Sequence, residues 1–263
     1  MILSCFFKLS HAQSFDTSEC RDTLKVLSFN IYHGEIYYKT DANSKASNLE
    51  IVAALIDSLK PDLVALQEVD FKTKRVEGKD ILTELACKTQ MVPMFGKAMA
   101  FNGGEYGVGI LSRFSLLKTE TQALANEEGK EPRVALCSYV QTAKGKKIRF
   151  VATHLDHTTE ELRLRQMQQI INAYAKDTIR TILTGDLNAV PGSETMQLAF
   201  KSFKATSNLE VPTIPSDKPE HKIDYILVRP ANCWRVIESS VINEQQASDH
   251  NPVFSIIELR TKN

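Results

Sequence analysis

The sequence predicts an α/β protein in which two mixed β-sheets pack face to face and are covered by helices. Most apolar stretches after residue 23 are short and rich in valine and isoleucine, as strands are. Only two stretches show a clear helical period. Several strands follow one another with no helix between them, whereas a parallel doubly wound sheet needs a regular alternation of strand and helix.

The strands are expected at residues 24–31, 63–69, 108–111, 134–142, 148–153, 180–183, 224–228 and 253–259. A helix is expected at 48–59, because its leucine, valine and isoleucine residues fall on one face and Pro61 follows it. A longer amphipathic helix is expected at 159–176. The order of these elements favours two sheets with helices on their outer faces.

The 263 residues are compatible with one large domain. We expect a signal-like or disordered segment at 1–22 and a single domain at 23–263. Residues 2–9 are mostly apolar, and Ser10-His11-Ala12 resembles a cleavage site, although Lys8 interrupts the apolar stretch. We therefore expect export to the periplasm or medium, with a cytosolic tail as the alternative. No later segment is long enough to span a membrane.

The composition argues against a protein that binds nucleic acid mainly through phosphates. The chain has 32 basic and 32 acidic residues, so it lacks the basic excess typical of such proteins. A local basic patch would be hidden in this total, so nucleic acid stays open as a partner but is not favoured. The five cysteines show no paired metal spacing. We expect a monomer.

Polar residues recur where the predicted strands begin or end. They are Asn30, Glu68, His154, Asp186 with Asn188, and finally Asp224, Asp249 and His250. Each has a simpler explanation as a turn residue, a solvated loop residue or a histidine at a strand end. Five independent turns would have no reason to share such an oxygen-rich set, and rigid strand ends place converging side chains with little freedom. The set therefore predicts a functional site.

The residue types in this set indicate a hard divalent cation. Carboxylate and amide oxygens dominate, with two histidines and no cysteine, which favours Mg²⁺ or Mn²⁺ over softer metals. Near the C-terminus, Asp224 can fix the tautomer of His250 and favour its protonated form. Asp249 is then free to approach a metal.

The same residues carry a resemblance to the endonuclease/exonuclease/phosphatase superfamily. Asn30, Gln67-Glu68, His154, Gly185-Asp186-Leu187-Asn188, Ile223-Asp224-Tyr225 and Ser248-Asp249-His250 occur in that family's order. The similarity runs over residues 24–259, and the connecting segments look like its compact bacterial branch. The resemblance implies a four-layer α/β/β/α sandwich, with mainly antiparallel sheets, and Mg²⁺-dependent cleavage of a phosphoester.

The resemblance also implies roles. Glu68 is expected to be the principal metal ligand, with Asn30 and Asp249 close to the ion. Asp186 is expected to orient or deprotonate the attacking water, with Asn188 beside it, while His154 and His250, the latter braced by Asp224, contact the phosphate. The resemblance leaves either Asp186 or His250 as the general base.

Residues around this set are assigned less firmly. Arg75, Tyr106 and His157 are candidates for substrate contact, with solvated or structural loop residues as the alternative. Arg133 is expected to be structural at the start of a strand. We expect a phosphodiesterase or phosphatase acting on a small or lipid-linked phosphoester; the alternatives are a DNA or RNA nuclease and, more remotely, a non-catalytic binding module on the same scaffold.

Overall fold

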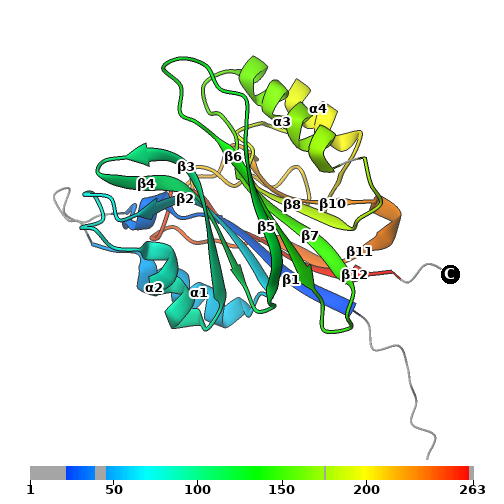
Figure 1. The fold of residues 1–263 in the computed structure, drawn as a ribbon, viewed down its shortest axis with the longest axis horizontal. Helices are drawn as coiled ribbons and strands as arrows, with labels where there is room; N and C mark the ends of the chain where they lie inside the picture. The colour runs from blue at the N-terminus through cyan, green and yellow to red at the C-terminus, as the bar shows by residue number, and fades with distance from the viewer. Residues whose placement is uncertain (1–21, 39–45, 175, 261–263) are drawn as a thin grey trace, which may run out of the picture.

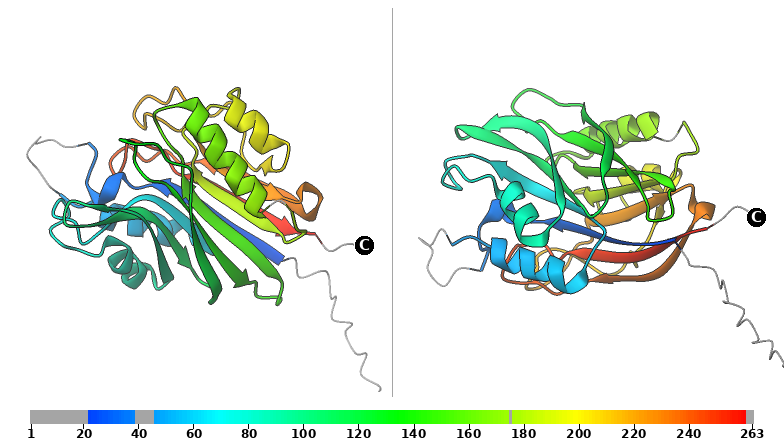
Figure 2. Two further views of the ribbon diagram at one scale, coloured as in Figure 1. Left: turned by 45° about the horizontal axis from the view of Figure 1, so that its top comes forward. Right: turned by 60° about the horizontal axis from the view of Figure 1, so that its bottom comes forward.

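The computed structural model describes residues 22–38, 46–174 and 176–260. In these ranges the chain forms two six-stranded sheets packed face to face, with helices against both outer faces (Figures 1 and 2). The four-layer α/β/β/α sandwich expected from the sequence is therefore confirmed. The expected N-terminal segment lies outside the described residues except for its last position.

The first sheet has the strand order β11-β12-β1-β2-β4-β3. Its strands are β1 (Asp22–Asn30), β2 (Leu63–Phe71), β3 (Val92–Phe101), β4 (Gly104–Ser112), β11 (Trp234–Val241) and β12 (Val253–Leu259). Only β1 and β2 pair in parallel. The outer face is covered by α1 (Leu49–Leu59) and α2 (Ile81–Thr89), whose apolar residues join those of β1 and β2 in one buried cluster. A short 3₁₀ turn, η1 (Tyr32–Gly34), follows β1.

The second sheet has the order β5-β6-β7-β8-β10-β9. Its strands are β5 (Leu116–Ala123), β6 (Val134–Gln141), β7 (Lys147–His154), β8 (Thr181–Asp186), β9 (Lys204–Ala205) and β10 (Asp224–Arg229). Here only β7 and β8 pair in parallel. The helices α3 (Glu160–Tyr174) and α4 (Glu194–Phe200) bury another apolar cluster against the outer face of this sheet. A second 3₁₀ turn, η2 (Ala231–Cys233), precedes β11.

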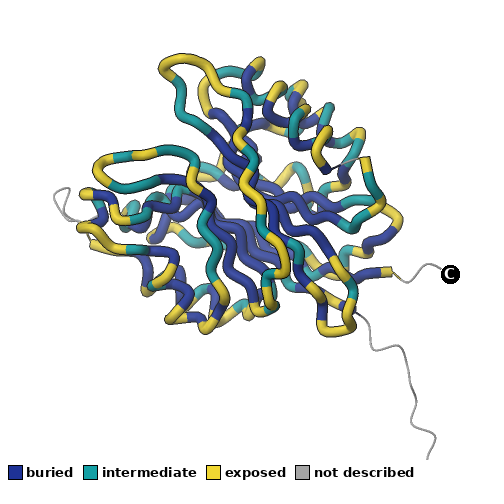
Figure 3. Tube along the Cα trace, viewed as in Figure 1, coloured by how far each residue is buried: buried dark blue, intermediate teal, exposed yellow. Residues whose placement is uncertain are grey.

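The main core lies between the two sheets. Inward-facing residues of β1, β2 and β4, such as Val26 and Ile110, pack in one cluster with Phe150 and Ile226 of the second sheet. Full burial of one such large side chain is worth roughly 1.5–3 kcal/mol, so this interface fixes how the sheets face each other. The central strands of both sheets are buried along their length (Figure 3).

Each strand and helix predicted from the sequence is present. The strands that were not predicted, β3, β5, β9 and β11, are the outermost strands of the two sheets. Edge strands are less buried and therefore carry more polar residues; β5, for example, is mostly exposed (Figure 3). The unpredicted helices α2 and α4 are short. No helix in the described ranges is long and apolar enough to cross a membrane.

Candidate active site

The two pairs of parallel strands bring the predicted polar residues to one edge of the sandwich. Asn30, at the end of β1, lies opposite Gln67 of β2, and His154, at the end of β7, lies opposite Asp186 of β8. Antiparallel β10 begins with Asp224, which also lies opposite Asp186. Because these strands are central in their sheets, residues distant in sequence meet at a rigid edge.

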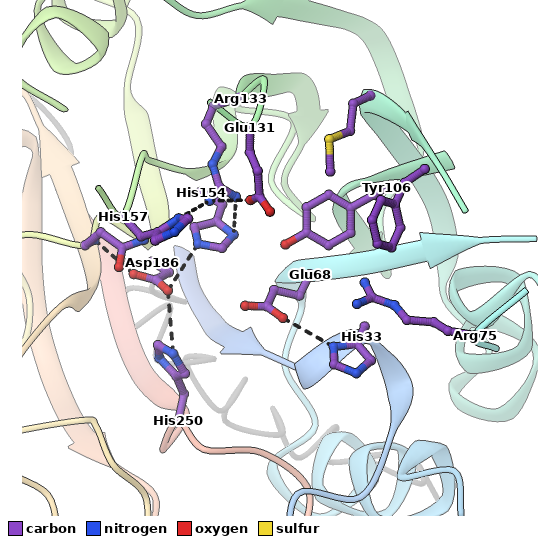
Figure 4. A pocket seen from close by; sticks show the side chains of 13 residues that line it. His33, Glu68, Arg75, Tyr106, Glu131, Arg133, His154, His157, Asp186 and His250 are labelled. Atoms are coloured by element: carbon purple, nitrogen blue, oxygen red, sulfur yellow. Dashed lines mark hydrogen bonds and ion pairs between the residues drawn. The ribbon is translucent and has the colours of Figure 1, made fainter. Parts of the chain in front are cut away.

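A cavity of about 300 Å³ lies at this edge (Figure 4). It is lined by His33, Glu68, Arg75, Met99, Phe101, Tyr106, Glu131, Arg133, His154, His157, Asp186, Asn188 and His250. The other predicted residues adjoin it: Asn30 and Asp224 are buried, and Asp249 is partly exposed. Of these lining residues, His33, Met99, Phe101 and Glu131 were not predicted from the sequence.

Glu68 enters the cavity from a β-bulge. The pairing of β2 with β4 slips between Leu66 and Val69, and Glu68 adopts a left-handed φ of 58°. A bulge re-aims a side chain, and such strained backbone is concentrated at functional sites. Glu68 Oε1 accepts a hydrogen bond of 3.0 Å from Asn30 Nδ2, and Oε2 lies 3.5 Å from Nδ1 of His33. Burial opposes ionisation, but His33 and Asn30 outweigh it and lower the pKa of Glu68 to about 2.

His250 is held by a buried carboxylate. Its Nδ1 lies 2.9 Å from Oδ2 of Asp224, and the same oxygen accepts a 2.6 Å hydrogen bond from Thr213. Burial alone would lower the pKa of His250, but the charges of Asp224 and Asp186 raise it to about 10. The ring is therefore a cation at neutral pH, as expected for a histidine beside a carboxylate.

Asp186 lies at the centre of the polar cluster. Its Oδ1 accepts a 2.9 Å hydrogen bond from the backbone N–H of Asn188, and its Oδ2 accepts one of 3.2 Å from Asn30. Burial and the nearby charge of Asp224 raise the pKa of Asp186 above its usual range. Asn188 donates through Nδ2 to the backbone oxygen of Leu155, so its amide oxygen is the atom left for a ligand.

His154 faces Asp186 from the end of β7. Its Nε2 lies 3.4 Å from Asp186 Oδ2, and its Nδ1 lies 3.0 Å from Nη1 of Arg133. Burial, reinforced by the charge of Arg133, lowers the pKa of His154 well below its ordinary value. These two of the histidines that line the cavity thus have opposite charge states, with His154 neutral and His250 cationic.

Arg133 is not an ordinary strand-start residue. It is 3% exposed and contacts His157 Nδ1 at 3.2 Å as well as His154, while Glu131 forms an ion pair of 2.9 Å with it. The expectation that Arg133 is only structural is thus incomplete, because its guanidinium links two histidines that line the cavity (Figure 4).

Arg75 and Tyr106 line the cavity on the side of Glu68 (Figure 4). The Nε and Nη2 atoms of Arg75 donate to the two carboxylate oxygens of buried Asp70, at 2.8 and 2.7 Å. Its guanidinium also lies 4.8 Å from the ring centroid of Phe101. These contacts hold Arg75 in one orientation, as bidentate pairs do. Burial and the charge of Glu68 raise the pKa of Tyr106, so its hydroxyl stays protonated.

The donors around Glu68 fit a hard cation. Burial raises the pKa of Asp249, and the charge of Glu68 adds to this rise, while the charge of His250 opposes it. A divalent ion would relieve the repulsion between Asp249 and Glu68 and would find carboxylate oxygens as ligands. Asn30 has its amide nitrogen towards Glu68, while its oxygen accepts from the backbone N–H of Tyr32. In this orientation Asn30 positions Glu68.

A second group of possible ligands comprises Asp186, Asp224 and His250, whose donor atoms all lie within 4.8 Å of one another. Two of them are already bonded to each other, because His250 Nδ1 contacts Asp224. Its Nε2 lies 3.7 Å from Asp186 and shares the positive charge of the ring. The group therefore also forms a hydrogen-bonded chain of acid and base.

His33 is the site residue that had a recognisable signal in the sequence. It follows Asn30 closely and precedes Gly34, and both His33 and Tyr32 adopt left-handed φ values, of 46° and 47°. This tight turn returns the ring of His33 to Glu68. A histidine before glycine, directly after a strand that ends in a site residue, could have pointed to it.

Comparison with known proteins supports this architecture. Residues 27–250 match the model of the Endonuclease/Exonuclease/phosphatase family. No curated protein matches the sequence. Among solved structures, an endonuclease/exonuclease/phosphatase from Beutenbergia cavernae is 22% identical, with a TM-score of 0.76 over 91% of this chain and 72% of that one. A Bacteroides vulgatus protein described in the same words is 21% identical, with a TM-score of 0.72 over 90% and 99% of the two chains. A mannosyl-6-phosphatase from Bacteroides thetaiotaomicron is 16% identical, with a TM-score of 0.70 over 89% and 99%.

Proposed function

The chain belongs to the endonuclease/exonuclease/phosphatase family, and on this basis we propose that it is a divalent-cation-dependent hydrolase of small-molecule or lipid-linked phosphoesters. The observation that carries the proposal is the arrangement around Asp186. A buried carboxylate with a raised pKa lies between a neutral histidine, His154, and a cationic one, His250. Ionised Glu68 lines the same cavity (Figure 4).

These charge states favour Asp186 over His250 as the base. A general base must lack its proton at the working pH, and His250 keeps its proton until about pH 10. Asp186 has a raised pKa, which brings its basicity closer to neutral pH and makes it the better proton acceptor. The Asn188 N–H fixes one oxygen of Asp186, and the amide oxygen of Asn188 can hold the attacking water.

The histidines then act on the phosphoryl oxygens. His250 supplies a positive charge and an N–H at Nε2, and its Nδ1 is held by Asp224. His154 is neutral and donates an N–H to a phosphoryl oxygen as negative charge develops on that oxygen. Glu68 and Asp249, with Asn30 as the orienting neighbour, would hold the cation. When bound, Mg²⁺ or Mn²⁺ supplies Lewis-acid stabilisation of phosphoryl charge.

The cavity supports a small substrate. Its volume of about 300 Å³ is at the low end for small-molecule pockets. Met99, Phe101 and Tyr106, from β3 and β4, line one wall and are consistent with a compact leaving group. The structural relative described as a mannosyl-6-phosphatase adds sugar phosphates to the substrates worth testing.

The proposal is tested with purified protein and Mg²⁺ or Mn²⁺ against a panel of phosphoesters. The panel holds bis-p-nitrophenyl phosphate, mannose 6-phosphate, inositol phosphates, sphingomyelin, and plasmid and abasic DNA. We expect metal-dependent release of product from one of the small or lipid substrates. Nicking of plasmid far faster than every small substrate would replace this proposal with a nuclease.

A substitution in the cavity tests whether any measured activity comes from this site. Glu68→Gln removes the ionised carboxylate while keeping a side chain that can accept from Asn30. It should reduce the metal-dependent rate by at least about a hundredfold, the scale of losing one strong transition-state interaction. Lys218→Gln, an exposed substitution outside the cavity, is the matched control. Undiminished turnover by Glu68→Gln would show that the reaction does not occur here.

A further inference from the structure

Arg133 connects two histidines through one guanidinium group. Its Nη1 lies 3.0 Å from Nδ1 of His154, and its Nη2 lies 3.2 Å from Nδ1 of His157. Arg133 is 3% exposed, and its Nη2 also forms an ion pair of 2.9 Å with Glu131. The guanidinium is therefore held on two edges, and its charge is balanced by a neighbouring carboxylate.

The chemistry of these contacts fixes where the protons are. A guanidinium has five N–H donors, no acceptor, and stays protonated in proteins. Each contacted Nδ1 must therefore accept, which requires that it carry no proton. A neutral imidazole has one N–H, so the proton of His154 and that of His157 are on Nε2 while these bonds are made.

Both histidines line the cavity (Figure 4). His154 Nε2 lies 3.4 Å from Oδ2 of Asp186. This nitrogen therefore donates towards the oxygen-binding region beside the proposed base. If the proton were on Nδ1, the Nε2 lone pair would face the carboxylate of Asp186 and could not donate to a phosphoryl oxygen.

We propose that Arg133 is a positioning residue that fixes His154 and His157 in the Nε2–H tautomer, so that both present donors for the oxygens of the substrate. The catalytic consequence rests on the proposed function, whereas the tautomers follow from the contacts alone. One arginine can do this for two rings because its nitrogens form a planar fork. Lysine has a single ammonium group and cannot match both contacts.

A purely structural role predicts something different. Arg149, on β7, is also 3% exposed, and it forms an ion pair with Asp177 and a hydrogen bond of 3.2 Å to Thr181. It does not line the cavity. Arg149→Met should therefore lower stability without altering the site histidines. Arg133→Met should alter them even at temperatures where both variants remain folded.

The tautomers can be read directly by long-range ¹H–¹⁵N spectra of protein labelled at histidine. The chain has six histidines, and His154→Gln and His157→Gln assign the two signals of interest. In the unmodified protein with Mg²⁺ both rings should show the Nε2–H pattern. In Arg133→Met at least His154 should lose it, and Arg149→Met should keep it. An unchanged His154 pattern in folded Arg133→Met would overturn the proposal.

Activity gives the second measurement. Arg133→Met should lower kcat by roughly tenfold to a hundredfold, the range seen when a partner that orients a functional histidine is removed. Arg133→Lys should recover only part of the loss, and Arg133→Ala should be partly rescued by added methylguanidinium, which Arg149→Ala should not be. If no phosphoester is hydrolysed by the unmodified protein, the proposed function fails while the spectra still decide the role of Arg133. Equal losses of kcat in Arg133→Met and Arg149→Met would assign Arg133 a structural role only.

Discussion

Oδ2 of Asp224 lies 2.9 Å from Nδ1 of His250, and this contact between the start of β10 and the loop before β12 determines the charge at the base of the cavity. The two residues are 26 positions apart and both are buried. Thr213 holds the same carboxylate oxygen, so the aspartate cannot easily turn away from the ring. The histidine is thereby kept as a cation in a site otherwise dominated by carboxylates.

Asp224→Asn should shift the pH range of activity. An adjacent carboxylate raises a histidine pKa by about 1–3 units, so its loss lets His250 lose its proton at a lower pH than about 10. His250 is protonated below its pKa and neutral above it, so lowering this pKa moves the loss of its positive charge to lower pH. We expect the alkaline limb of the kcat/KM profile, measured at saturating Mg²⁺, to move to lower pH by a similar amount. Superimposable alkaline limbs would contradict this role for Asp224.

Arg75→Ala should destabilise the fold through Asp70. Asp70 is fully buried, and Arg75 supplies two of its hydrogen bonds, while Thr73 supplies another. Removing one partner of a buried ion pair leaves an uncompensated charge and costs about 3 kcal/mol or more. Urea denaturation should show this loss. The double variant Arg75→Ala, Asp70→Asn should lose less free energy of unfolding than the two single variants together, by about 0.5–3 kcal/mol. Strict additivity would show that the two side chains are not coupled.

Gly185→Ala should be far more damaging than Gly192→Ala. A Cβ at Gly185 would collide with the backbone oxygen of Thr153 on β7, whereas at Gly192 nothing lies within 4 Å. The close approach of β7 and β8 places His154 beside Asp186. We expect a loss of at least about 3 kcal/mol for Gly185→Ala, because backbone must move. For Gly192→Ala the change should stay within about 1 kcal/mol. Similar thermal midpoints for the two variants would argue against this account.

Asp156 should contribute stability that disappears in acid. Its Oδ1 accepts from the backbone N–H groups of Thr158, at 2.8 Å, and Thr159, at 3.0 Å, in the turn before α3. Burial opposes ionisation, but these bonds and the Thr158 hydroxyl lower the pKa of Asp156. A carboxylate with a depressed folded pKa stabilises the fold above its unfolded pKa, about 3.9, and this contribution is lost as pH falls through the folded pKa.

The matched comparison is Asp156→Asn, which resembles the protonated acid at every pH. At pH 7 the variant should be less stable by about 1–3 kcal/mol, the value of hydrogen bonds to a charged group. Below about pH 4 the two proteins should converge in urea denaturation. A difference that stayed constant from pH 7 to pH 3 would mean that the charge of Asp156 is not involved.

Central strands and the polar residues at their ends were readable from the sequence. Buried strands such as β2 and β8 contain an apolar stretch before their polar end, so a carboxylate or amide at that end stands out. Edge strands gave no such contrast, because solvent reaches one side of β5 and β11. Met99 and Phe101 were missed for this reason, since both lie on the edge strand β3.

The sequence by itself determined the fold class and which residue types would meet, because periodicity and the position of polar residues depend only on local order along the chain. Apart from the protonated His250 expected beside Asp224, tertiary structure decided their charge states. Glu68 is ionised because its contacts with His33 and Asn30 outweigh its burial, whereas His154 is neutral because it is buried beside the charge of Arg133. Burial and the approach of neighbouring charges depend on three-dimensional packing, so the chemistry of the same residue types could be assigned only after the sheets were placed together.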